Sequence, residues 1–173
     1  MPMPASPEDL LAYLDALGIE AETVEHPPLF TVEESQALRG EIPGGHTKNL
    51  FVKDKKGRIF LLVLGEETSV DLKRVHEKIG AQGRVSFGSA ELLEEALGVQ
   101  PGAVTPFGAI NDKARRVLIV LDEAMMGHQR LNFHPIVNTR TTGIASADLV
   151  KFLRATGHEP LIVALGHERV RVE

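Results

Sequence analysis

Residues 50–64, LFVKDKKGRIFLLVL, decide the fold expected for this chain. Two strand-like runs, Leu50 to Lys53 and Arg58 to Leu64, flank Asp54-Lys55-Lys56-Gly57, a turn sequence that closes a β-hairpin. After its first residue the second run is entirely apolar, which is typical of a strand in the centre of a sheet covered on both faces. The stretch therefore predicts a covered sheet with at least one antiparallel pair.

Further strands and helices are predicted on both sides of this hairpin. The clearest is RVLIVL, Arg116 to Leu121, a second apolar strand. Shorter strands are predicted over residues 20–25, 84–87, 131–134 (as an edge strand) and 161–165. Helices are predicted from Ser6 to Leu17 and over residues 31–38, 69–79, 89–97 and 146–155, with Ser6, Ser89 and Ser146 as N-terminal caps. These elements do not alternate as clean βαβ units, so we expect an α/β fold with a mixed, partly antiparallel sheet surrounded by helices.

Length and composition predict a single domain spanning residues 1–173, with 43% hydrophobic residues to build an aliphatic core. The chain has no cysteine, so disulfides, thiolate nucleophiles and thiolate metal sites are excluded. The longest apolar runs, such as the six residues from Ile59 to Leu64, are too short to cross a bilayer, and the first residues lack the pattern of a secretory signal. We therefore expect a soluble, cytoplasmic protein with no membrane partner.

The net charge of −5 limits the choice of partners. A general nucleic-acid coat protein is normally basic, because phosphate contacts dominate its affinity. Any polynucleotide must here meet a local positive patch, and two groups of basic residues are candidates, although each is also explained as a solvated face. They are Lys53, Lys55, Lys56 and Arg58 around the hairpin turn, and Lys73, Arg74 and Lys78 further along the chain.

The stretch Gly98 to Asp112, GVQPGAVTPFGAIND, carries the strongest functional signal. It has no helical or strand period, and at its centre Gly102 to Pro106 reads as a Gly-x-x-x-Pro loop. Glycine allows the backbone to come close to a ligand, while proline fixes φ and removes a donor. Such a loop can point free N–H groups at an anion, a carbonyl or a developing oxyanion. The alternative is an ordinary surface connection.

Two polar clusters lie outside this loop. The first is Gly44 to Asn49, GGHTKN, which precedes the first hairpin strand and can place the cation of Lys48 and the amide of Asn49 in a cleft. The second is Asn132 to Pro135, where the proline holds His134 stiffly beside it. Each cluster has a structural alternative, a glycine turn with a surface lysine for the first and a turn-capping histidine for the second.

The sequence predicts neither a cofactor nor a metal site. The seven histidines are scattered without the spacing of a zinc motif, and the serines lie in no nucleophile-elbow motif. A metal hydrolase that used His46 and His134 would need a third ligand, and the sequence does not identify one.

Four stretches together are similar to a known family. They are HPPLFTVEES, TKNLFVKDKKGRIFLLVL, VTPFGAINDKARRVLIVLDEAM and NFHPIVNTRTTGIASADLVKFLRATGHEP. In order and spacing they resemble the YbaK/prolyl-tRNA editing superfamily over roughly residue 8 to residue 165, and within it the free-standing ProX-type Ala-tRNA(Pro) deacylases. The resemblance implies a mixed sheet surrounded by helices and an aminoacyl-tRNA hydrolase that acts on the 3′ end of a mischarged tRNA, with prolyl-tRNA synthetase as a further possible partner.

The resemblance also implies site residues by position. The family's lysine and asparagine match Lys48 and Asn49, its Gly-x-x-x-Pro loop matches Gly102 to Pro106, and its histidine matches His134. On this basis Lys48, Gly102 and His134 are expected to be catalytic, and Asn49 to bind substrate. The remaining loop residues are also expected to bind substrate: Ala103, Val104, Thr105 and Pro106.

These residues are suited to ester hydrolysis. An aminoacyl ester is already activated, so a placed water and a stabilised oxyanion suffice and no covalent nucleophile is needed. The backbone around Gly102 would polarise the ester carbonyl, Lys48 and Asn49 would hold the terminal nucleotide, and His134 would position a polar group or shape the pocket. Two other functions stay open: a Cys-tRNA(Pro) deacylase of the YbaK type, and a non-catalytic module that binds tRNA or the synthetase.

Overall fold

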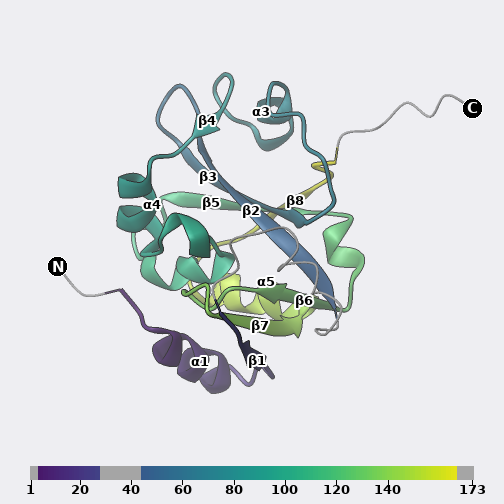
Figure 1. Cartoon of the computed structure of the whole chain (residues 1–173). Helices are drawn as coiled ribbons and strands as arrows, with labels where there is room; N and C mark the ends of the chain where they lie inside the picture. Colours follow the sequence, from purple (N-terminus) through teal and green to yellow (C-terminus); the bar gives the residue numbers. More distant parts are fainter. Residues whose placement is uncertain (1–3, 28–43, 167–173) are drawn as a thin grey trace, which may run out of the picture.

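The computed structural model describes residues 4–27 and 44–166 of the chain (Figure 1). Within these residues, eight strands form one sheet in the order β1-β7-β6-β2-β3-β5-β8, with the short β4 paired to β2. The β6–β2, β3–β5 and β5–β8 pairs are parallel and the others antiparallel, which confirms the predicted mixed sheet. The strands are β1 (Glu22–Glu25), β2 (Gly45–Lys53), β3 (Ile59–Gly65), β4 (Ser86–Phe87), β5 (Val117–Asp122), β6 (Arg130–Phe133), β7 (Arg140–Ala145) and β8 (Leu161–Val163).

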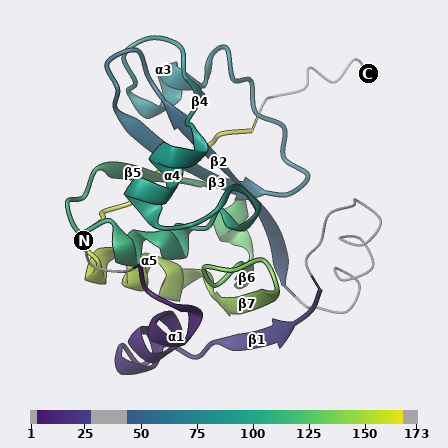
Figure 2. The ribbon, with the colours of Figure 1, turned by 60° about the vertical axis from the view of Figure 1, so that its left-hand side comes forward.

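Helices cover both faces of the sheet, and Figure 2 shows them from a second side. One face carries α3, while the other carries α1, α4, α5 and the 3-10 turns of the glycine-rich stretch. The helical elements are α1 (Pro7–Ala16), α3 (Val75–Ile79), α4 (Ala90–Leu97), η1 (Pro101–Ala103), η2 (Pro106–Asn111), η3 (Met125–Gly127) and α5 (Ser146–Ala155). None of the described helices is long and apolar enough to span a membrane.

The predicted hairpin is the centre of the molecule. Alternate residues of β3 belong to two separate core clusters, Ile59, Leu61 and Val63 to the first and Phe60, Leu62 and Leu64 to the second. All six side chains are buried, and each contributes about 1.5–3 kcal/mol by leaving water. The apolar run was therefore a sound predictor of a strand covered on both faces.

Strand β2 is long because it joins two parts of the sheet (Figure 1). It pairs with β6 through Gly45 and His46 and with β3 from Thr47 to Lys53. Both Lys48 and Asn49 consequently lie inside a strand, whereas the sequence had placed them before one.

Local signals set the ends of α1 and α4 as predicted. Ser6 and Asp9 form a reciprocal capping box at the start of α1, with N···O distances of 3.0 and 3.1 Å. The Ser89 hydroxyl accepts from the Leu92 amide at 3.0 Å, and Gly98 ends α4 in the left-handed region with φ of 67°. These two helices depend only on nearby residues, so the sequence predicts them well.

Four expectations differ from the structure. The helix predicted over residues 69–79 is reduced to α3, because the Asp71 carboxylate accepts the Lys73 amide at 3.0 Å and holds this segment in turns. Strand β6 lies between β7 and β2 and is not an edge strand. Strand β7 was not predicted at all, and Ser146 begins α5 without making a cap hydrogen bond. The helix expected over residues 31–38 falls outside the described residues.

Candidate functional site

The edge of β2 is open along part of its length. Pairing with β6 ends at His46, and pairing with β4 begins only at Val52. Between these points, over residues 47–51, β3 is the one strand beside β2 among the described strands. A stretch of strand edge is therefore available to a ligand in the middle of the sheet.

Asn49 presents its backbone to this open edge. The His46 carbonyl accepts from the Glu66 amide at 2.9 Å, on the β3 side of β2, whereas the Phe51 carbonyl accepts from the Gly88 amide at 3.0 Å on the opposite side. The N–H and C=O of one strand residue point to the same side, and the side alternates along the strand. The backbone groups of Asn49 therefore point away from β3 toward the open edge, on the same side of β2 where the Phe51 carbonyl is paired with Gly88.

A cavity of about 160 Å³ lies at the same edge. Its wall is formed by β2, the residues around β4, the start of α4 and the η1 segment. Its lining is mostly apolar and includes Asn49, Phe51, Phe87, Leu93, Pro101 and Val104. We call this space the edge cavity.

The side chain of Asn49 supplies an unused acceptor at the edge cavity. Its Oδ1 atom is buried and has no hydrogen-bond partner among the described residues. A buried polar atom without a partner costs about 1–3 kcal/mol of stability. Such an atom in a cavity wall is available to a ligand that brings a donor.

The glycine-rich loop brings unpaired amides close to the same place. The Ala103 amide donates to the Gln100 carbonyl at 2.8 Å, but no hydrogen bond among the described residues uses the amides of Gly102 or Val104. Gly102 has no positive φ; it permits a close approach instead, since an added Cβ would lie 3.2 Å from Asn138 Nδ2. The loop is thus in contact with the turn that joins β6 to β7.

The rest of this loop is fixed by its own contacts. Thr105 is fully buried, and its hydroxyl accepts from the Phe107 amide at 3.2 Å. Pro106 begins η2, and the Phe107 ring packs edge-on against Phe133 and Phe152, with centroid distances of 5.6 and 5.4 Å. Residues Thr105 to Phe107 therefore anchor the loop in the core, while Gly102 is exposed and Val104 is half-buried against the core.

His134 lies in the β6–β7 turn, and its ring orientation is defined. Its Nδ1 is 3.1 Å from the Arg140 carbonyl, which can only accept, so Nδ1 carries the hydrogen and Nε2 is left as an acceptor in the neutral ring. Burial lowers the pKa of His134 below its ordinary value of 6.5; the Arg140 hydrogen bond raises it less, and the nearby His26 lowers it further. His134 is therefore neutral at physiological pH.

The backbone beside His134 is strained. Ile136 has φ of 74°, a left-handed conformation that β-branched residues rarely adopt, and its amide donates to the His134 carbonyl at 3.0 Å. Strain of this kind persists where the surrounding structure holds it, and it is found often at ligand sites.

Lys48 emerges on the other face of the sheet. The β2–β3 register runs from Thr47 to Lys53 without a bulge, so side chains alternate strictly. Leu50 packs against the cluster beneath α3, whereas Phe51 belongs to the opposite cluster. Lys48 shares the face of Leu50, and Asn49 shares the face of Phe51.

The predicted site residues are thus only partly brought together. Asn49 and Val104 line the edge cavity, and Gly102 contacts the turn that carries His134. Lys48 lies on the opposite face and could reach the cavity only around the strand edge. Among the described residues, no group of three or more His, Asp or Glu side chains is placed to hold a metal ion.

Several cavity residues were not predicted from the sequence. In the sequence, nothing distinguishes Phe51, Phe87 and Leu93 from ordinary strand or helix residues. The cavity wall that they share arises from tertiary packing. One signal existed in Gly88: an added Cβ at this position would lie 2.5 Å from the Phe51 ring. A glycine between a strand and a capping serine marks this close approach.

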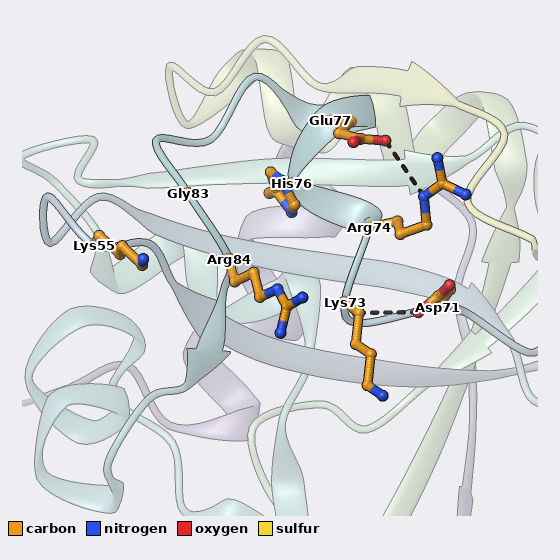
Figure 3. A pocket seen from close by; sticks show the side chains of 8 residues that line it. All are labelled: Lys55, Asp71, Lys73, Arg74, His76, Glu77, Gly83 and Arg84. Atoms are coloured by element: carbon orange, nitrogen blue, oxygen red, sulfur yellow. Dashed lines mark hydrogen bonds and ion pairs between the residues drawn. The ribbon is translucent and has the colours of Figure 1, made fainter.

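The structure also joins the two basic groups of the sequence at one pocket (Figure 3). Lys55 from the hairpin turn and Lys73 and Arg74 from the segment before α3 line a cavity of about 560 Å³, and Arg84 joins them. We call this the basic pocket.

Comparisons with known proteins identify the family to which this chain is similar. The family model of the aminoacyl-tRNA editing domain matches residues 26–152. A zebrafish (Danio rerio) protein called prolyl-tRNA synthetase associated domain-containing protein 1 is 38% identical over 159 residues, covering 91% of this chain and 86% of its own. The prolyl-tRNA editing protein ProX of Acetoanaerobium sticklandii is 36% identical over 150 residues, covering 86% of this chain and 91% of its own.

A solved structure has the same fold as this chain. A protein assigned as a candidate trans-editing enzyme for prolyl-tRNA synthetase superimposes with a TM-score of 0.71, covering 95% of this chain and 99% of its own. The two sequences are 19% identical, so this likeness concerns the fold alone.

Proposed function

The chain belongs to the aminoacyl-tRNA editing domain family and is an aminoacyl-tRNA deacylase, and we propose that it hydrolyses mischarged tRNA(Pro) in trans, with Ala-tRNA(Pro) as its substrate. The relatives named above are described as acting on prolyl-tRNA or as associated with its synthetase. We accordingly place the protein in the cytoplasm, with the 3′ end of tRNA as its partner and prolyl-tRNA synthetase as a second one.

The observation that carries the proposal is the edge cavity. It combines a small apolar space of about 160 Å³ with a buried acceptor on Asn49 and with amides on Gly102 and Val104 that no described residue pairs. Hydrolysis of an activated ester needs a bound acyl group, a placed water and donors that face the developing oxyanion. The cavity and its rim offer the first and the last of these without a protein nucleophile.

We assign the oxyanion contacts to Gly102 and Val104. Their amides are unpaired among the described residues, whereas the Ala103 amide is already used within the loop. An ester oxygen at the mouth of the cavity would meet donors there that need no rearrangement. Asn49 Oδ1 would then accept a hydrogen bond from the substrate's α-ammonium group or ribose hydroxyl.

His134 and Lys48 receive supporting roles. Neutral His134 keeps an acceptor at Nε2, which would suit the positioning of a water or of the free ribose hydroxyl that orients the attacking water. Lys48 lies on the opposite face and is suited to a phosphate of the RNA rather than to the reacting ester.

The apolar lining of the edge cavity supports alanine as the edited residue. A synthetic site built for proline cannot strongly reject the smaller alanine, because a missing methylene changes binding by only about 1–3 kcal/mol. A second, smaller pocket that excludes proline by size completes the discrimination. Apolar walls formed by Phe51, Leu93 and Val104 favour a methyl group over a polar side chain.

The proposal is tested by ester hydrolysis. Purified protein is mixed with Ala-, Cys-, Ser- and Pro-tRNA(Pro), and loss of the aminoacyl ester is followed. We expect hydrolysis of the alanyl ester to be fastest and the prolyl ester to be spared. Fastest hydrolysis of the cysteinyl ester would reassign the substrate, and no hydrolysis of any intact substrate would leave only a binding module.

Val104→Ala tests whether the edge cavity holds the amino acid. Truncation enlarges the cavity, so hydrolysis of Pro-tRNA(Pro) should rise relative to Ala-tRNA(Pro). Val150→Ala, which removes the same atoms from a partly buried position of α5, serves as the control and should leave the ratio unchanged. An unchanged ratio in Val104→Ala would move the amino-acid site elsewhere.

A further inference from the structure

Phe87 is exposed although it lies in a paired strand, β4. Three large hydrophobic side chains of the described residues are exposed: Val24 at 42%, Ile162 at 44% and Phe87 at 61%. Phe87 is the one aromatic among them, and it also lines the edge cavity. A ring with a free face beside a ligand cavity is a stacking platform for a nucleobase.

The basic pocket offers unpaired cations. Four cations and two carboxylates line it, in a chain whose net charge is −5. Arg74 pairs with Glu77 at 3.7 Å, but Lys55, Lys73 and Arg84 make no ion pair among the described residues. In Figure 3 the Arg84 side chain lies between those of Lys55 and Lys73. The local excess of positive charge suits a phosphate backbone.

Asp54 holds the two sides of the basic pocket together. It is buried; its Oδ1 accepts from the amides of Lys56 and Arg58, both at 2.9 Å, and its Oδ2 accepts from the Gln82 amide at 2.8 Å. The Lys55 amide donates in turn to the Gln82 carbonyl at 3.2 Å. One carboxylate thus fixes the hairpin turn against the segment that leads to Arg84.

Strand β4 connects the basic pocket to the edge cavity. Arg84 lines the first space and Phe87 the second, and only two residues separate them. Phe87 pairs with Val52, whose side chain belongs to the cluster beneath α3, so Phe87, Lys48 and the basic pocket share one face of the sheet. The reacting ester and the RNA backbone would therefore approach β2 from its two faces, around the open edge.

We infer that the single-stranded 3′ end of the tRNA crosses β4, with one base stacked on Phe87 and the preceding phosphates held by Lys55, Lys73 and Arg84. This inference rests on the proposed function, because it takes the 3′ end of tRNA to be the ligand. It adds a direction of approach: the RNA enters over α3 and β4, and its aminoacyl group turns around the β2 edge into the cavity.

Binding of uncharged RNA tests the inference apart from hydrolysis. Fluorescence anisotropy compares an acceptor-stem hairpin carrying a single-stranded 3′ tail with the same hairpin without the tail. The wild type should prefer the tailed RNA. Phe87→Ala should weaken binding of the tailed RNA about tenfold and leave the blunt RNA unchanged, whereas Phe87→Tyr should retain the preference.

The cations are tested by salt dependence. Arg84→Ala and Lys73→Ala should each weaken both RNAs and reduce the slope of log K against log salt by about 0.7–0.9, the release expected for one phosphate contact. Two controls match these changes on other surfaces: Ile162→Ala for an exposed apolar residue and Lys151→Ala for an exposed lysine of α5. Both controls should bind like the wild type.

Specific outcomes would overturn the inference. They are the absence of a tail preference in the wild type, a Phe87→Ala variant that binds the tailed RNA normally, or equal losses in the controls. Hydrolysis of Ala-tRNA(Pro), measured on the same proteins, separates the two proposals. If the RNA binds as described but no ester is hydrolysed, the proposed activity is wrong and the proposed RNA path stands. If the ester is hydrolysed but Phe87→Ala binds the tailed RNA normally, the activity stands and the path is wrong.

Discussion

Two consecutive residues of β2 illustrate how one strand can serve two faces. Asn49 and Lys48 differ by one position, yet the pleat directs the first toward the edge cavity and the second toward the face that carries α3. We therefore expect their substitutions to act on different steps of the reaction. Lys48→Ala should raise KM for the tRNA, while Asn49→Ala should lower kcat.

Asn49→Ala also has an unusual expected effect on stability. Because Asn49 Oδ1 is buried and no described residue bonds to it, its removal should leave the free energy of unfolding unchanged or raise it by about 1 kcal/mol, while activity falls at least tenfold. Urea denaturation and single-turnover deacylation measure the two quantities. A loss of stability together with activity would show that Asn49 is a structural residue. Asn111→Ala is a contrasting variant, since its amide donates to the Leu97 carbonyl at 2.9 Å and its loss should destabilise the fold.

His134 makes a prediction about pH. Burial lowers the pKa of its imidazole below the ordinary value of 6.5, so the unfolded chain takes up this proton more readily than the folded one. The contribution of His134 to stability is therefore fully present above pH 6.5 and is lost as the pH falls toward the folded pKa. NMR titration of the imidazole nitrogens should give a midpoint below 6.5, with Nδ1 protonated above it. A midpoint at or above 6.5 would contradict the assignment.

At the scale of elements, the hairpin turn depends on the Asp54 carboxylate. Burial raises the pKa of Asp54, but the amide hydrogen bonds from Gln82, Arg58 and Lys56, together with the Arg58 charge, outweigh it and leave the pKa below its usual range. Asp54→Asn should lower the free energy of unfolding by about 1–3 kcal/mol at pH 7. The lowered folded pKa means that this difference should shrink as the pH falls below about 4, when the wild-type carboxylate also takes up its proton.

Urea denaturation of the two proteins at pH 7 and pH 3 tests this prediction. Asp71→Asn is the matched control, because its carboxylate accepts one amide hydrogen bond in an exposed setting and its loss should change stability by less than about 0.5 kcal/mol. A difference for Asp54→Asn that stays constant with pH would refute the role of the ionised carboxylate.

Elements built from local signals were predictable from the sequence. The hairpin around Asp54, the capped helix after Ser89 and the apolar run from Ile59 each depend on neighbours along the chain. Strand β7 was missed because its sequence, RTTGIA, is not strongly apolar and its pairing with β6 and β1 is decided elsewhere in the chain.

The sequence could predict which residues are candidates for the site, but it could not predict how they are arranged. The sequence and the family resemblance identified Asn49, the glycine-rich loop and His134 as candidates, but neither could say which sheet face each side chain occupies. The face of Lys48 follows from where β2 begins and from the β3 register, and both depend on pairings with distant residues. The apolar walls formed by Phe51 and Phe87 arise from packing between segments, which no local pattern encodes.

At the scale of the molecule, β2 organises both the fold and the proposed site. It joins the β1-β7-β6 part of the sheet to the β3-β5-β8 part, and its two sets of pairings leave the edge between them open. The same gap that separates β6 from β4 creates the cavity. The strand β2 therefore holds the two parts of the sheet together and also forms the wall of the proposed site. This double role explains why glycines and polar residues occur in such a central strand.

Charge is distributed unevenly over the molecule, and this leads to the last prediction. The basic pocket lies beside α3, whereas acidic residues gather around α4, where Asp9, Glu91, Glu94 and Glu95 line a separate cavity of about 840 Å³. A net charge of −5 repels RNA at long range, so binding should depend on the basic pocket and weaken with salt as a few phosphate contacts are lost.

Replacing one distant acidic residue by a basic one should therefore change the association of the tRNA with the protein without changing the rate of ester hydrolysis. Glu94→Lys changes the net charge from −5 to −3 at a position outside both proposed binding surfaces. It should lower KM for tRNA severalfold in low salt. The effect should be small once the salt concentration brings the Debye length down to about 8 Å. The single-turnover rate at saturating tRNA should stay unchanged, because the edge cavity is untouched. Glu94→Gln should give half the effect, as expected for half the charge change. A changed single-turnover rate, or an effect on KM that persists in high salt, would mean that α4 contacts the tRNA directly and that the path over α3 and β4 is incomplete.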